Sequence, residues 1–168
     1  MAGNSIVKTR GSRIMRPAGF LFKGANMIDI DRKHLVVMME AGYVYLGMQK
    51  FKEAYQVFEG VASLAPDSDI PLVALGGVDF CVGKFGSAIK WYRKALKVDP
   101  NSIFAKVYIG EALFFSGEKD EAVATLQQVS NEDPGGGAGD FARALVGAIN
   151  QGFTPKMLAG FGGLKGAT

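Results

Sequence analysis

Histidine and cysteine often carry catalysis and metal binding, and this 168-residue chain contains one of each. His34 has no cysteine or second histidine near it in the sequence, so its spacing does not fit a metal site. Cys81 lies between two apolar residues, where cysteine usually packs as a small side chain, and the single histidine is not placed to act as its base. We therefore predict no catalytic residue, no metal site and no cofactor, and a protein that is not an enzyme.

A glycine-rich run from Gly135 to Asp140 superficially resembles a phosphate-binding loop. It lacks the Lys and Ser/Thr that would complete such a loop, and no strand precedes it, so we interpret it as a flexible joint. Acidic residues at Glu118, Asp120 and Glu121 fall at the start of a predicted helix. Negative charge there offsets the helix dipole, which indicates a structural role.

Basic residues gather in two places. Lys90, Arg93, Lys94 and Lys97 share one face of a predicted helix, which either binds an acidic partner or is simply solvated. Residues 1–28 hold five basic side chains and no acid, whereas the remainder has 14 basic and 16 acidic ones. A basic arm on a near-neutral body does not indicate nucleic-acid binding, and either a disordered arm or an organellar presequence would have this composition.

The composition, 48% hydrophobic and 21% charged, is typical of a folded domain. The apolar run at residues 35–39 is far shorter than the roughly 18 residues of a membrane helix, so we expect no membrane span. The segment around Ala18–Phe22 is interrupted by glycine and does not fit a secretory signal. A single cysteine cannot form an internal disulfide, so we expect a cytoplasmic protein.

Three sets of residues recur at a spacing of 34 and divide the chain into units 35–68, 69–102 and 103–136. Small residues let two antiparallel helices approach closely, and proline ends the second helix of each unit. Each glycine costs about 1 kcal/mol of helix propensity relative to alanine, so close packing must offset it. The three sets are Gly42, Gly76 and Gly110; Ala54, Ala88 and Ala122; and Pro66, Pro100 and Pro134.

This pattern resembles the tetratricopeptide repeat family. The middle unit matches best, with Leu75, Gly76, Gly83, Phe85, Ala88, Tyr92, Ala95 and Pro100, whereas the first unit has Gln49 where glycine is usual. The resemblance implies an all-α, right-handed superhelical solenoid of three helix pairs. We predict a basic disordered arm at 1–18, a short N-terminal helical segment at 19–34, the repeats at 35–136, a capping helix at 137–152 and a Gly-rich flexible tail at 153–168.

The capping helix is expected because three repeats leave an apolar end uncovered. Asp140 can serve as its N-cap, and Phe141, Leu145 and Ile149 recur on one face at four-residue spacing.

In the family, the first helix of each unit lines a concave groove. The resemblance implies that this groove is formed by Val36, Met39, Tyr43, Leu46, Ile70, Val73, Phe80, Phe104, Val107, Glu111 and Phe114, together with Gly77. Where related proteins hold a peptide carboxylate with cations, this chain has Met39, Tyr43, Ala74, Phe104 and Tyr108. We therefore expect the groove to bind a hydrophobic segment of a partner protein, as a helix or an extended strand.

A narrower resemblance is to bacterial type III secretion chaperones of the tetratricopeptide class. The similar stretches are Phe20–Lys23, Lys50–Phe58 and Gly110–Ala122. The resemblance implies a cytoplasmic, virulence-associated chaperone for a secreted translocator, or a co-chaperone for the needle subunit. The alternative is a structural scaffold or a homodimer that uses convex and terminal faces. The sequence does not identify the partner or the oligomeric state.

Overall fold

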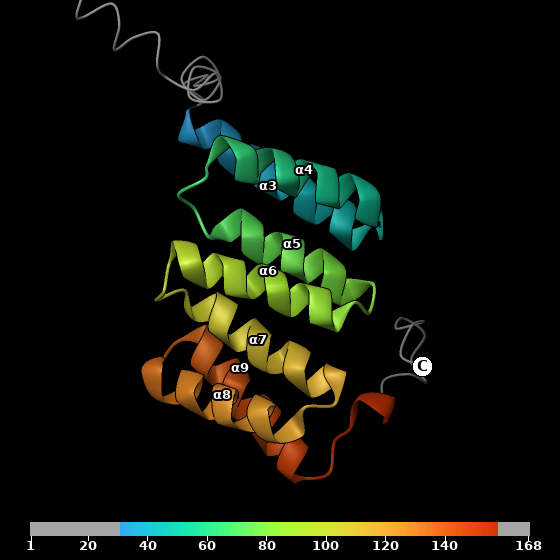
Figure 1. The fold of residues 1–168 in the computed structure, drawn as a ribbon, viewed down its shortest axis with the longest axis vertical. Helices are drawn as coiled ribbons and strands as arrows, with labels where there is room; N and C mark the ends of the chain where they lie inside the picture. The colour runs from blue at the N-terminus through green and yellow to red at the C-terminus, as the bar shows by residue number, and fades with distance from the viewer. Residues whose placement is uncertain (1–30, 158–168) are drawn as a thin grey trace, which may run out of the picture.

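The computed structural model describes residues 31–157, which form an all-α solenoid of helix pairs, as predicted (Figure 1). The predicted arm, residues 19–30 of the N-terminal segment and residues 158–168 of the tail lie outside the described residues. The helices are α3 (Arg32–Gly47), α4 (Phe51–Leu64), α5 (Ile70–Cys81), α6 (Phe85–Val98), α7 (Ile103–Ser116), α8 (Lys119–Glu132) and α9 (Gly137–Asn150), followed by the 3₁₀ turn η1 (Pro155–Met157).

The helices pair as α3 with α4, α5 with α6 and α7 with α8, and the pairs stack along the long axis in chain order (Figure 1). α9 packs against both α8 and α7. The first helix begins at Arg32, three residues before the predicted unit, because the Asp31 carboxylate accepts a 3.1 Å hydrogen bond from the Lys33 amide and caps it.

Close contact within each pair depends on the predicted glycines, and this prediction is confirmed. Each first helix presents a glycine to a large side chain of its partner helix, and the alanines of the second helices are fully buried. A Cβ at Gly42, Gly76 or Gly110 would lie 2.4, 2.3 or 2.7 Å from Phe58, Tyr92 or Leu126, respectively. Such distances are too short for real contacts, so alanine would force the helices apart.

Turn and stop signals also recur with the repeat. The turn inside each pair has a left-handed residue at the same position, with φ of 58° at Gln49, 78° at Gly83 and 96° at Gly117. Gln49 therefore adopts a conformation that favours glycine. The second helices end at Leu64, Val98 and Glu132, each two residues before a repeat proline, as predicted.

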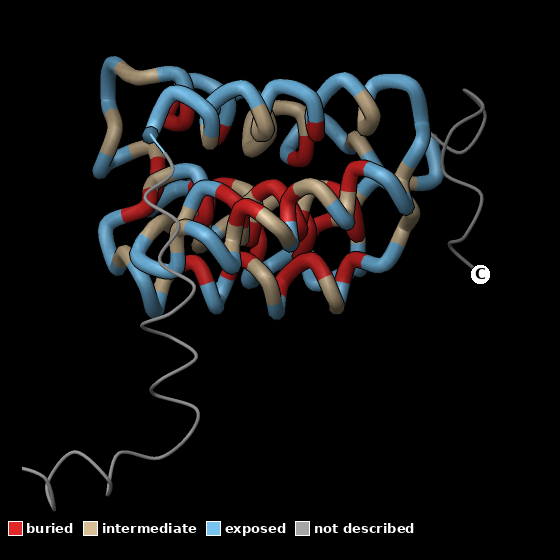
Figure 2. Tube along the Cα trace, turned by 90° about the horizontal axis from the view of Figure 1, so that it is seen from above, coloured by how far each residue is buried: buried red, intermediate tan, exposed pale blue. Residues whose placement is uncertain are grey.

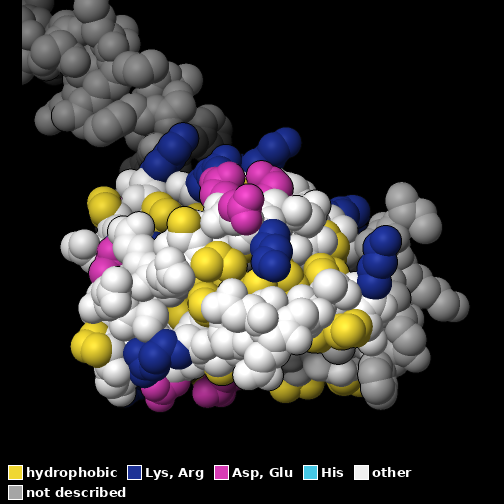
Figure 3. Space-filling model, turned by 90° about the horizontal axis from the view of Figure 1, so that it is seen from below, with side chains coloured by type: hydrophobic (Ala, Val, Ile, Leu, Met, Phe, Trp, Pro, Cys, Tyr) yellow, Lys and Arg dark blue, Asp and Glu magenta, His cyan; other side chains and the backbone are white. Residues whose placement is uncertain are grey.

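The core is thickest in the second half of the molecule. One buried cluster joins α6, α7, α8 and α9, and a smaller one joins α3, α4 and α5. In α3 the buried residue is Gly42, and most of this helix is exposed (Figure 2). At the other end, formed by α8 and α9, hydrophobic side chains appear in separate areas among polar and charged ones (Figure 3). The first pair thus packs against the solenoid on one side alone.

The glycine run between α8 and α9 is not a flexible joint but a tightly packed junction. Asp133 lies against it, and a Cβ at Gly136 would fall 2.0 Å from its carboxylate, whereas a Cβ at Gly139 would fall 1.7 Å from its backbone oxygen. The Gly139 amide donates a 3.0 Å hydrogen bond to Asp133 Oδ2. Gly136, rather than the predicted Asp140, is the N-cap of α9; the Asp133 carboxylate binds an amide of its first turn, and Asp140 pairs with Arg143.

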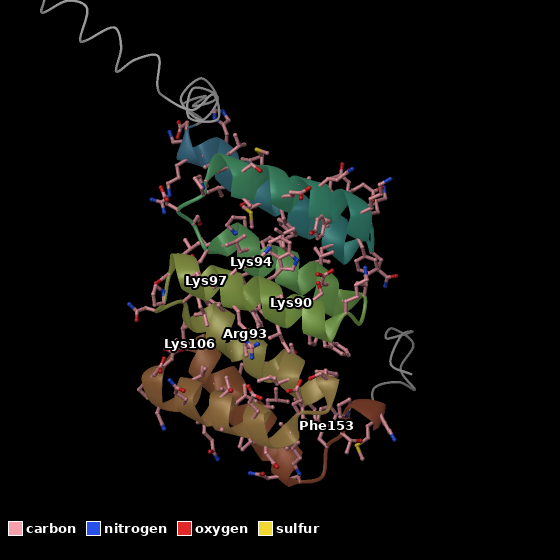
Figure 4. All side chains as sticks on the ribbon, in the orientation of Figure 1. Lys90, Arg93, Lys94, Lys97, Lys106 and Phe153 are labelled. Carbon is pink, nitrogen blue, oxygen red and sulfur yellow. The ribbon has the colours of Figure 1, made fainter. Side chains whose placement is uncertain are left out.

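The chain after α9 corrects the prediction of a flexible tail that starts at residue 153. Phe153 is partly buried and stacks on Phe114 of α7, with ring centroids 5.7 Å apart. It lies beside the carboxyl end of α7 (Figure 4). The segment that follows α9 therefore folds back onto the third helix pair.

Candidate functional site

The first helices of the three pairs present a row of apolar side chains at one repeat position. Val36, Ile70 and Phe104 are 51%, 54% and 55% exposed. The starts of α5 and α7 are tied together because Ser102, the N-cap of α7, donates a 2.5 Å hydrogen bond to the Asp69 carboxylate at the start of α5. We call the side of α3, α5 and α7 that carries Val36, Ile70 and Phe104 the first-helix face.

The other predicted groove residues of α3 and α5 are less exposed. Tyr43 is 49% exposed and packs edge-on against Phe58, with centroids 5.1 Å apart. Met39, Leu46, Val73 and Phe80 are partly buried. All five retain some surface on the first-helix face, so their proposed contact with a partner stays a prediction.

Two predicted groove residues on α7 do not lie at the surface. Val107 is 2% exposed and Phe114 is 3% exposed. The physical reason is that α9 packs on α7 and Phe153 covers Phe114. The residues of α7 with more surface on this side are Phe104, Tyr108, Glu111 and Phe115, at spacings of four, three and four. The sequence assignment of α7 was therefore out of phase by one residue at two of its four positions.

Aromatic side chains line this stripe of α7. Phe104 stacks on Tyr108 with centroids 6.4 Å apart, and Tyr108 packs on Tyr92 of α6 at 5.8 Å. Phe115, near the other end of α7, packs edge-on against Phe80 of α5 at 5.3 Å. Phe115 is the residue of this stripe that the sequence analysis missed, and Tyr108 was named there only as a replacement for a carboxylate-binding residue, although a four-three-four spacing from Phe104 identifies both.

Glu111 is the acid of this stripe, and it stands in apolar surroundings. Burial raises the pKa of Glu111 from its ordinary value of 4.5 to about 7. Within residues 31–157, Glu111 forms no ion pair. Its charge also acts on its neighbours: burial first, and then Glu111, raises the pKa of the Cys81 thiol and of the Tyr108 hydroxyl. Cys81 is thus held in the protonated form, which is the opposite of what a nucleophilic cysteine needs.

The four cations of α6 lie along the outer side of that helix (Figure 4). Arg93 is 3.8 Å from Glu121 of α8, and Lys94 lies 3.9 Å above the ring of Trp91. Two of the four cations of α6 therefore already have a partner within the protein. This favours a solvated face over a binding site for an acidic partner.

Two shallow depressions lie away from the first-helix face. One, of about 440 Å³, lies between α8 and α9, and its Arg143 is already bound to the Pro134 carbonyl oxygen at 3.0 Å. The other, of about 430 Å³, lies between α4 and the α5–α6 pair, and its Asp79 accepts a 2.6 Å hydrogen bond from Ser87. Arg143 and Asp79 are therefore both engaged by the protein itself.

The part of the chain that the structure describes contains no group of three or more His, Cys, Asp or Glu side chains placed to hold a metal ion. Over residues 31–157 there is also no helix with the length and apolar character needed to cross a membrane.

Comparison with known proteins gives a match to the family described as "Protein kinase G tetratricopeptide repeat" over residues 39–148. The chain is also 30% identical over 118 residues to the protein described as CTR9 homolog from Arabidopsis thaliana. This match covers 70% of the chain and 10% of that protein, so the chain spans about a tenth of its relative.

Solved structures with the same fold include the translocator chaperone SycD of Yersinia enterocolitica, with a TM-score of 0.66, 18% identity, and coverage of 72% of this chain and 93% of SycD. PcrH in complex with the chaperone-binding region of PopD has a TM-score of 0.62, 16% identity, and coverage of 73% and 95%. The first tetratricopeptide domain of Spaghetti (RPAP3) bound to an HSP90 peptide has a TM-score of 0.62, 21% identity, and coverage of 74% and 96%.

Proposed function

The chain belongs to the tetratricopeptide repeat family, and from this premise we propose that its first-helix face binds an apolar segment of another protein. The observation that carries the proposal is the row of Val36, Ile70 and Phe104, each more than half exposed at the same repeat position. Aligned apolar side chains that are left exposed on a folded domain usually mark a surface that another molecule covers.

The chemistry of the face favours an apolar ligand over a carboxylate. One protein of this fold is solved with an HSP90 peptide and another with the chaperone-binding region of PopD, so the fold alone does not select the ligand. Met39, Tyr43 and Phe104 are predicted groove residues of this chain, and none of them is a cation that can pair with a carboxylate. Apolar and aromatic side chains recognise a partner by burying its apolar side chains, as a helix or an extended strand.

We further propose that the partner is a secreted translocator and that the chain acts as its cytoplasmic chaperone in type III secretion. The likeness of fold to SycD and PcrH supports this assignment. A needle subunit is the alternative cargo. Co-expression of the chain with each candidate cargo, followed by size-exclusion chromatography, tests the assignment, and failure of both cargoes to co-elute would exclude it.

A matched pair of adjacent residues tests the binding face. Val36 lies in the exposed row, and Val37, 61% exposed, lies about 100° further round the same helix. Val36→Glu should weaken binding at least about tenfold because it places a charge against apolar ligand atoms, and Val37→Glu should leave binding within about twofold. The probe is a displayed library of random peptides, and its best binders are then measured by calorimetry. Equal effects of the two substitutions would exclude this face.

Self-association is the second candidate function, because α3 has exposed apolar residues beyond the row. Val37, Val44 and Met48 are 61%, 61% and 57% exposed at the end of the solenoid. A scaffold or homodimer that used this terminal surface would bury them. Sedimentation velocity of the full chain and of Val37→Glu decides the matter: a dimer that Val37→Glu converts to a monomer supports self-association, and a monomer in both samples excludes it.

A further inference from the structure

We propose that Glu111, together with Tyr108 and Phe104, forms a recognition site for one lysine or arginine side chain of the bound segment. The inference rests on the proposed function and adds a charge requirement to it. The partner segment is then apolar with a single cation, rather than apolar throughout. The site lies on α7, the last of the three helices that form the first-helix face.

The first argument is charge complementarity. Glu111 is the one acid among the predicted groove positions, and none of them is basic. Two cations near this part of the solenoid are engaged elsewhere: Lys106 of α7 binds Glu132 at 2.6 Å, and Arg143 of α9 binds Asp140. The described titratable groups that interact with the Glu111 charge are the hydroxyls of Tyr92 and Tyr108 and the thiol of Cys81, and none of these is a cation. A cation from a partner would therefore supply a counter-charge that the described chain does not.

The second argument is the aromatic surface beside the acid. Tyr108 is one helical turn before Glu111 on the same stripe of α7, and its ring stacks on that of Phe104 with an interplanar angle of 28°. Phe104 is 55% exposed. Aromatic faces attract ammonium and guanidinium groups. A lysine or arginine of the partner that lies against these rings would therefore have its charge stabilised by the rings as well as by the Glu111 carboxylate.

The third argument is space. Gly77 occupies the same repeat position on α5 that Glu111 occupies on α7, and a Cβ at Gly77 would meet no atom within 4 Å. The neighbouring helix thus offers no side chain at the position equivalent to Glu111. A long lysine or arginine stem can lie there and bury its methylene groups while its charge meets the acid.

The experiment uses the full chain and a displayed library of apolar peptides in which each position is randomised in turn. The best binder and its variants with lysine replaced by norleucine or glutamate are then measured by calorimetry. We expect lysine or arginine to be enriched at one position, and the lysine peptide to bind about tenfold or more tightly than the norleucine peptide. In Glu111→Gln this ratio should fall to within about twofold.

Glu59→Gln, which removes an exposed acid from α4, is the matched control and should leave the ratio unchanged. In the wild type, the ratio should also fall as the pH drops below about 7, because Glu111 is then protonated. Enrichment without a cation, or a lysine preference that survives Glu111→Gln, overturns this inference and leaves the proposed function standing. No binding of any peptide by the wild type overturns both.

Discussion

Glu111→Gln should make the protein more stable at alkaline pH and have little effect in acid. The pKa of Glu111 is raised from 4.5 to about 7 by burial, so the folded state holds this proton more tightly than the unfolded state. The stability contributed by this group is therefore complete below pH 4.5 and is lost as the pH rises to about 7. At about 1.4 kcal/mol for each pH unit between the two values, the cost of the ionised group reaches about 3 kcal/mol. Glutamine carries no charge and escapes this cost.

The assay is urea unfolding of the full chain, followed by circular dichroism from pH 4 to pH 8. The free energy of unfolding of Glu111→Gln minus that of the wild type should be near zero at pH 4 and approach about 3 kcal/mol at pH 8. Taking the difference cancels the titration of the other groups, including Glu132, whose pKa is lowered by its hydrogen bond to Lys106. Glu59→Gln serves as the exposed control. A difference of the same size at pH 4 and pH 8 would refute the reasoning, because it would show that the folded structure does not perturb Glu111.

Two adjacent glycines should respond to alanine with opposite signs. Gly76→Ala should lower the free energy of unfolding by about 1 to 3 kcal/mol, because its Cβ would lie 2.3 Å from Tyr92. Gly77→Ala should raise it by up to about 1 kcal/mol, because its Cβ meets no atom within 4 Å. Urea unfolding that gave both variants the same sign would contradict the packing. Gln49→Gly should stabilise by about 0.5 to 1 kcal/mol by relieving the positive φ of 58°, and a loss of stability in the same assay would show that this turn is not strained. Phe153→Ala should lower the free energy of unfolding by about 1 to 2 kcal/mol through loss of its stacking on Phe114, and an unchanged value would show that this segment is not held on α7.

The repeat could be predicted because each helix pair needs the same residue types at the same positions. Two helices that approach closely need a glycine such as Gly76 opposite a large side chain, and a helix that must stop needs a proline shortly after its end. Each requirement leaves the same residue type every 34 positions. The fold class, the helix pairs and the glycine contacts followed from that pattern.

The junction before α9 could not be predicted in the same way. The glycines of this run were visible in the sequence, but the group that requires Gly136 and Gly139 is Asp133, whose carboxylate binds the Gly139 amide and whose backbone oxygen occupies the space of a Gly139 Cβ. A run of glycines is compatible with either flexibility or close packing. The contact that distinguishes these two cases exists only in the folded chain.

The sequence by itself determined that this protein is a solenoid of three helix pairs whose first helices carry apolar residues at regular positions. The tertiary structure alone decided which of those residues reach the surface. Phe104 is exposed and Phe114 is buried, although both are phenylalanines at predicted groove positions of α7, because Phe114 lies on the face of the helix that packs against Phe153 and Phe104 does not. The pKa of Glu111 likewise depends on what surrounds its carboxylate. The exposed fraction of a side chain and the pKa of a carboxyl group are set by residues that are distant in sequence, so the spacing of residues within one helix does not predict them.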